Sequence, residues 1–131
     1  GAYFALHSLA GQRIEKAFLI SPIVDMEELI IQMMAQAGIT EGELEKRKEI
    51  YTSCGEKISW EYLCYVRKNP LAWNIPTEVL YGESDHMTSC ETISAFASLT
   101  GAGLTVMKGG EHWFHTKEQM AFLDAWIKRS Q

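Results

Sequence analysis

The sequence predicts an α/β protein with a partial parallel sheet of about three strands and helices on both faces. Short apolar runs at Ala17–Ile20 and 75–82 are typical of strands buried in a parallel sheet, and residues 104–107 are predicted to form a third strand. Segments with the hydrophobic spacing of helices lie before, between and after these runs. Strands that alternate with helices favour a parallel sheet, and right-handed crossovers then place helices on both of its faces.

The helices are predicted from their hydrophobic stripes and from the residues at their ends. Helices are expected over residues 2–10, 26–37, 40–51, 60–68 and 89–99, with a last one from Thr116 to about Arg129. Thr40 followed by Glu43 is typical of a capping box, and Thr116 and Ser59 are typical N-caps. In the last helix, Met120, Leu123 and Ile127 are expected to form the inner face.

The chain is expected to be one incomplete domain over residues 1–131, with a lid-like helical segment over about 26–74. That segment is longer than a single crossover needs, and extra helices between two strands often cover a site. Its larger apolar side chains either line an acyl pocket or only pack its helices. They are Met33, Met34, Trp60, Tyr62 and Tyr65.

Composition excludes several classes of function. The net charge of −5 disfavours a nucleic-acid surface, and no apolar run approaches the length of a membrane span. Three cysteines without a C-x-x-C pair indicate a reduced, cytoplasmic setting rather than a disulfide framework. No cofactor is expected, and a flavodoxin-like phosphate binder is disfavoured because no glycine-rich loop leads from a strand into a helix.

Polar side chains follow each of the three predicted strands. Asp25 follows the first strand, Asp85 the second and His112, after two glycines, the third. Sites of open parallel sheets lie beyond the carboxyl ends of the strands, so we expect Asp85 and His112 to meet there. A carboxylate that binds one ring nitrogen of a histidine leaves the other free to take a proton from a nucleophile.

The other candidates have simpler interpretations. Asp25 is expected to be a turn residue or the N-cap of the next helix, and His115 and His7 are expected to be structural. A metal site built from His86, His112 and His115 is conceivable, but their spacing does not match a zinc pattern.

Residues 75–85, which read IPTEVLYGESD, resemble the penultimate strand and acid loop of α/β-hydrolases. Residues 109–114, GGEHWF, resemble the histidine loop of that family, and 116–127 and 17–25 resemble its closing helix and the strand before its lid. The resemblance covers the C-terminal half of the family fold. It implies that Asp85 is the acid and His112 the general base of a Ser-Asp-His triad.

The chain departs from the family at the nucleophile. No G-x-S-x-G elbow occurs, although residues 1–6, GAYFAL, resemble the segment directly after the nucleophile in the family. We therefore expect a C-terminal fragment of a serine hydrolase, inactive as it stands, whose parent cleaves a small-molecule acyl substrate: an ester, thioester or amide. Gly1 is then either the last glycine of the elbow or a cloning residue.

The expected partners depend on the incomplete sheet. An exposed sheet edge recruits other strands, so we expect a homo-oligomer or pairing with the N-terminal half, and no nucleic acid or membrane. Two alternatives stay open. The chain is a non-catalytic binding or scaffold protein that uses the hydrolase fold, or its parent carries Asp or Cys in place of the nucleophilic serine.

Overall fold

A computed structural model describes residues 1–131, which form two compact units. The first unit contains Gly1–Val24 and Leu71–Gln131, and the second contains Asp25–Pro70. The second unit covers nearly the same residues as the predicted lid-like segment 26–74.

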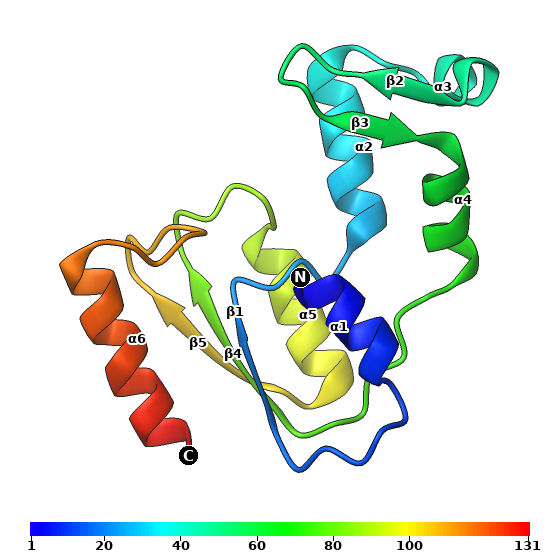
Figure 1. Cartoon of the computed structure of the whole chain (residues 1–131). Helices are drawn as coiled ribbons and strands as arrows, with labels where there is room; N and C mark the ends of the chain where they lie inside the picture. Colours follow the sequence, from blue (N-terminus) through cyan, green and yellow to red (C-terminus); the bar gives the residue numbers. More distant parts are fainter. The chain divides into compact units, whose positions relative to one another are not determined.

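The first unit is built on a three-stranded parallel sheet (Figure 1). Its strands are β1 (Ala17–Ile20), β4 (Thr77–Gly82) and β5 (Gly103–Met107). They lie in the order β1-β4-β5, and both pairs are parallel. The predicted partial parallel sheet of three strands is confirmed, and the strand that leads into the loop of Asp85 lies in the centre.

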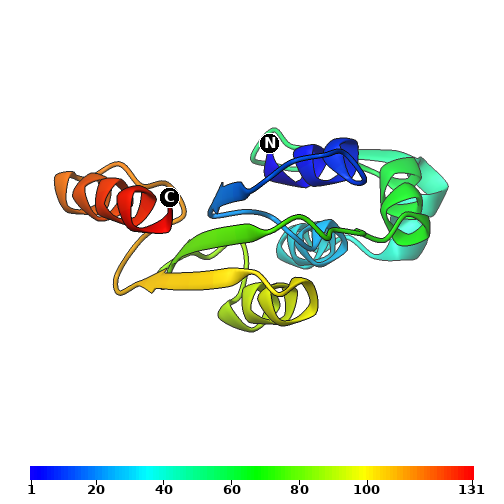
Figure 2. The same cartoon turned by 90° about the horizontal axis from the view of Figure 1, so that it is seen from below.

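Helices cover both faces of this sheet, as predicted (Figure 2). The helices of the first unit are α1 (Ala2–Leu9), α5 (Cys90–Thr100) and α6 (Lys117–Ser130). Successive side chains of a strand point to opposite faces. Val79 and Tyr81 therefore enter one core with residues of α1 and α5, while Leu80 packs against Trp126 of α6 on the other face. β4, which leads into the loop of Asp85, is thus buried on both faces.

The prediction that β1 is a buried strand was wrong. Phe18 and Ile20 are 38% and 42% exposed. β1 lies at the edge of the sheet, where the ring of Phe18 makes an edge contact with Trp126 of α6 at 5.8 Å between ring centroids. A continuous apolar run indicates a strand but not how much of it neighbouring elements cover.

The second unit contains three helices and a β-hairpin. The helices are α2 (Met26–Ala37), α3 (Glu41–Arg47) and α4 (Trp60–Lys68), and the antiparallel strands are β2 (Glu49–Tyr51) and β3 (Lys57–Ser59). The predicted helix from Thr40 to Tyr51 was wrong beyond Arg47. Lys48 adopts a positive φ of 69°, and α3 ends there. In β2, Ile50 is buried and the residues on either side of it are exposed.

The predicted helix starts are otherwise confirmed. Thr40, Ser59 and Thr116 each accept a hydrogen bond from a backbone N–H of the helix that they precede. The predicted capping box of Thr40 forms only this half of its hydrogen bonds, whereas Thr116 forms a full capping box with Gln119. The inner face of α6 differs from the prediction, because Met120 is 49% exposed whereas Trp126 is buried.

Candidate functional site

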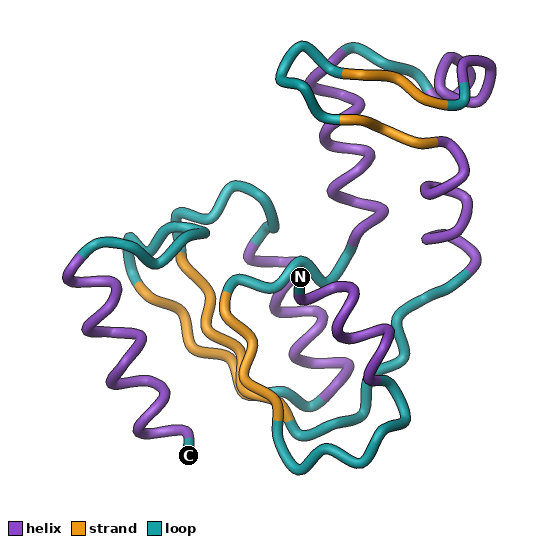
Figure 3. The backbone as a smooth tube through the Cα atoms, viewed as in Figure 1, coloured by secondary structure: helices purple, strands orange, loops and turns teal.

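The loops after β1, β4 and β5 leave the sheet at the same end, where the carboxyl ends of the three parallel strands lie (Figure 3). The loop after β4 carries Asp85, and the loop after β5 carries His112. Since β4 and β5 are neighbours in the sheet, the two side chains start from adjacent strand ends. Open parallel sheets place their sites at this carboxyl end of the strands.

Asp85 and His112 are in contact. The Asp85 Oδ2 atom lies 2.7 Å from His112 Nδ1, and the second oxygen, Oδ1, accepts a hydrogen bond of 2.8 Å from the backbone N–H of Met87. A carboxylate only accepts hydrogen bonds, so His112 Nδ1 is the donor. The Asp85 side chain is 1% exposed and the His112 side chain 36% exposed. The Asp85 carboxylate is thus buried in the protein, whereas the His112 ring is partly open to solvent.

Backbone hydrogen bonds join the two loops. The N–H of Ser84 donates to the carbonyl of Gly110 at 2.8 Å, and the N–H of Glu83 donates to the carbonyl of Met107 at 3.0 Å. In the opposite direction, the N–H of Gly109 donates to a carboxylate oxygen of Glu83 at 2.9 Å. The relative position of the acid and the histidine therefore depends on backbone contacts as well as on their own side chains.

The central strand also supports the acid loop through Tyr81. The Tyr81 hydroxyl donates to the carbonyl of Thr88 at 2.7 Å and lies 3.4 Å from the carbonyl of Asp85. Burial of the ring raises the pKa of the Tyr81 phenol, with a smaller contribution from the charge of Asp85. The phenol therefore stays protonated and keeps donating over a wider pH range than a free tyrosine.

The pair has the geometry of an oriented general base. Asp85 fixes the tautomer in which Nδ1 carries the proton, and it can stabilise the charged imidazolium. His112 Nε2 is then the nitrogen available to accept a proton. No serine of residues 1–131 forms a hydrogen bond with His112.

The other candidate residues lie elsewhere. Asp25 is the N-cap of α2 and accepts from the N–H of Glu28 at 2.9 Å, as predicted. His7 contacts the ring of Tyr3, with 4.7 Å between ring centroids. His115 binds the carbonyl of Trp113 through Nδ1 at 2.7 Å.

His86, His112 and His115 do not form a metal site. No group of three or more His, Cys, Asp or Glu side chains is arranged to hold a metal ion.

Sequence reasoning missed Ser21, which follows β1 at the same edge. Its φ is 46°, a left-handed conformation that is uncommon outside glycine, and its buried hydroxyl has no hydrogen-bond partner. The backbone N–H of Ser21 donates to the carbonyl of Leu80 at 2.9 Å, which extends the pairing of β1 with β4 by one residue. The only signal in the sequence is the following Pro22, which does not predict a positive φ at the residue before it.

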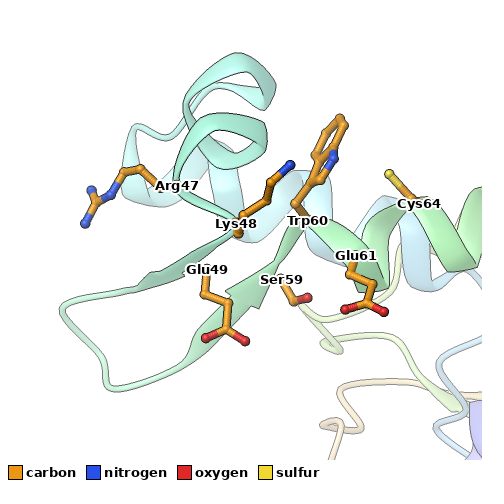
Figure 4. Close-up of a pocket in the computed structure, with 7 residues that line it drawn as sticks. All are labelled: Arg47, Lys48, Glu49, Ser59, Trp60, Glu61 and Cys64. Carbon is orange, nitrogen blue, oxygen red and sulfur yellow. The ribbon is translucent and has the colours of Figure 1, made fainter.

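The second unit contains an open pocket of about 520 Å³ (Figure 4). It is lined by Arg47, Lys48, Glu49, Ser59, Trp60, Glu61 and Cys64. Of the five large apolar side chains of the lid-like segment, only Trp60 lines it. Most of the other lining groups are charged or polar, and neither Asp85 nor His112 contributes. The Asp85–His112 pair is therefore not part of this pocket, and most of the lid-like segment's large apolar side chains are not part of its lining.

Comparison with solved structures identifies the fold. The chain superposes on Est1E from Butyrivibrio proteoclasticus with a TM-score of 0.70, at 17% identity and over 98% of its residues. It also matches the mouse alpha/beta hydrolase domain-containing protein 10, with a TM-score of 0.66 at 17% identity over its whole length. The chain has the fold of part of an α/β-hydrolase. A third match is the Pyrococcus furiosus esterase Pf2001, with a TM-score of 0.55 at 14% identity over 99% of the chain.

The α/β-hydrolase fold is matched in part only. The chain spans 57% of Est1E, 60% of the mouse protein and 47% of the Pyrococcus furiosus esterase. No protein-family profile matches the sequence, and no curated protein does. No helix has both the length and the apolar character needed to span a membrane.

Proposed function

We propose that Asp85 and His112 are the acid and the general base of a serine hydrolase that cleaves a carboxylic ester, thioester or amide. The observation that carries this proposal is the 2.7 Å contact between Asp85 Oδ2 and His112 Nδ1 at the carboxyl ends of the strands. The α/β-hydrolase fold supports it, because two of the matched structures are esterases or hydrolases by name. The nucleophile is a serine outside residues 1–131.

In the proposed reaction, His112 Nε2 accepts the proton of the serine hydroxyl while the serine oxygen attacks the substrate carbonyl. The negative charge of the tetrahedral intermediate then needs hydrogen-bond donors, typically backbone N–H groups. Collapse of the intermediate breaks the bond to the leaving group, which takes the proton from His112. Water then attacks the acyl-enzyme by the same route, and His112 again accepts and returns a proton. Asp85 stabilises the imidazolium in both halves.

The chain by itself is then expected to be inactive. It contributes a base and its orienting acid but no serine hydrogen-bonded to that base. A fluorophosphonate probe, which reacts with activated serines, tests this directly. We expect no labelling of residues 1–131 and labelling of the product of the whole coding region that contains them. We expect His112→Gln to abolish that labelling and His7→Gln, a change in α1, to leave it unchanged. Labelling that persists in His112→Gln would remove His112 from the mechanism.

The substrate class and the cellular setting are part of the same proposal. Since a structure of Est1E contains ferulic acid, feruloyl esters belong in the first substrate panel beside short acyl esters and thioesters. The three cysteines are free, and two of them are exposed, which favours the reducing cytoplasm.

The edge of β1 supports a proposal about partners. β1 pairs with β4 on one side only, and its Phe18 and Ile20 side chains are more than one-third exposed. An open, apolar edge of this kind recruits a further strand. We assign this edge to a strand from outside residues 1–131, either of the rest of a longer chain or of a second copy.

A further inference from the structure

We propose that Gln119, in the first turn of α6, is a positioning residue that sets the orientation of His112. This role concerns the geometry of His112, and its catalytic meaning rests on the proposed function. Gln119 does not touch His112. Its side-chain amide instead binds the loop on both sides of that residue.

The two ends of the Gln119 amide bind different parts of the loop. The Oε1 atom accepts from the N–H of His115 at 3.0 Å and from the N–H of Thr116 at 3.4 Å. The Nε2 group donates to Glu111 Oε2 at 2.9 Å. One buried side chain, 5% exposed, thus joins the residue directly before His112 to the third and fourth residues after it.

A helix cap alone does not require this arrangement. A capping box needs an acceptor at its third position, which either Gln or Glu supplies. The donor half of the Gln119 amide has no role in the cap, and it binds the carboxylate of Glu111. A glutamate at position 119 would keep the cap but would place two carboxylates against each other. The identity of residue 119 therefore matters for the loop more than for the helix.

The contacts of neighbouring side chains show how the rest of the histidine loop is held, with Gln119 as the link between its two ends. Phe114 is buried in the core with Trp126, which anchors the middle of the loop. His115 Nδ1 binds the Trp113 carbonyl and lies 3.6 Å from the same Glu111 oxygen that Gln119 binds. The carboxylate of Glu111 is thus held by Gln119 from the buried side and faces a histidine on the exposed side.

Exchange of the Gln119 and Glu111 side chains tests this inference. Gln119→Glu breaks the link, and the double variant Gln119→Glu with Glu111→Gln restores it with donor and acceptor reversed and the net charge of the wild type. The readout is the downfield NMR signal of His112 Nδ1–H in residues 1–131, which reports the hydrogen bond to Asp85 and does not depend on hydrolysis. We expect Gln119→Glu to broaden or shift the signal and the double variant to recover it.

Two further variants separate this role from helix capping. Thr116→Ala weakens the cap of α6 without removing the Gln119–Glu111 bond, so it should lower the melting temperature and leave the His112 signal in place. Glu111→Ala removes an exposed side chain and should perturb the signal even if Gln119→Glu does not fold. An unchanged His112 signal in folded Gln119→Glu and Glu111→Ala, or no recovery in the double variant, would overturn the inference. Failure of the proposed hydrolysis would leave these results unaffected.

Discussion

Gly82 and Gly110 lie backbone to backbone where the acid loop meets the histidine loop. A Cβ atom added to Gly110 would lie 3.1 Å from the Cα of Gly82, and one added to Gly82 would overlap the Gly110 carbonyl. The close approach allows the hydrogen bond from Ser84 to Gly110 and brings Asp85 within reach of His112. Gly110 comes directly after Gly109, whose φ of 67° favours glycine.

Gly82→Ala should therefore destabilise the first unit. A methyl group there cannot be accommodated without moving the histidine loop, and overpacking of this kind costs about 1–3 kcal/mol. Urea denaturation of residues 1–131 measures the change. Gly42→Ala is the matched control, because a Cβ there meets nothing within 4 Å. In helix α3 it should be neutral or stabilising by up to about 1 kcal/mol. Equal stabilities of the two variants would contradict the close approach.

Ser21 stores backbone strain at the end of β1. Ser21→Gly and Ser21→Ala both remove the unpartnered hydroxyl, but only glycine adopts a φ of 46° without a Cβ clash. We expect Ser21→Gly to be more stable than Ser21→Ala by about 1 kcal/mol in urea denaturation. Alanine as stable as glycine at this position would show that the conformation is not strained.

Arg67 joins two helices of the second unit, and this link predicts a pH dependence. Its guanidinium binds Glu27 of α2 and Glu41 of α3. The hydrogen bond from Arg67 lowers the pKa of Glu41 below its ordinary value. Because this pKa is lower in the folded unit than in an unfolded chain, the link contributes stability above the ordinary glutamate pKa. That stability is lost as the pH falls through the lowered value.

Amide hydrogen exchange within residues 25–70 measures this loss. On acidification, protection in the wild type should fall toward that of Glu41→Gln, which lacks the charge at every pH. Glu45→Gln is the control, since the ion pairs of Arg67 are with Glu27 and Glu41, and it should keep the wild-type pH dependence. A constant difference between wild type and Glu41→Gln at all pH values would contradict the prediction.

The edge of β1 predicts self-association of residues 1–131. Ile20→Lys places a charge on the exposed side chain beside the open edge and should shift the chain toward monomer in light scattering over a dilution series. Leu99→Lys changes a side chain that is 88% exposed on α5, away from this edge, and should not. A wild-type chain that is monomeric at every concentration would exclude a second copy at this edge.

Much of this fold was predictable because local chemistry determines it. Apolar runs indicated the three strands, and capping residues such as Ser59 and Thr116 marked helix starts that the structure confirms. The β-hairpin was missed because Glu43 and Arg47 continue a helical charge pattern up to Lys48. Nothing in that pattern indicates the positive φ at which the helix ends.

The candidate site was predictable in part for a different reason. Asp85 and His112 could be placed because parallel strands end at one edge, which is a topological rule. Gln119 and Ser21 could not be placed. The proposed role of Gln119 depends on a contact with Glu111 across a loop, and Ser21 is distinguished by its backbone conformation. Neither feature leaves a periodic signal in the sequence.

The proposed roles of Asp85 and His112 are tested most directly by ester hydrolysis with the product of the whole coding region. We expect His112→Gln to lower kcat/KM by about 10⁶-fold and Asp85→Asn by about 10⁴-fold, because the first removes the base and the second its orienting carboxylate. His7→Gln, a change in α1 where the ring contacts Tyr3, should change it by less than about threefold, on the order of 1 kcal/mol or below. Hydrolysis that is equally fast in all three variants would contradict the assignment of Asp85 and His112 as acid and base.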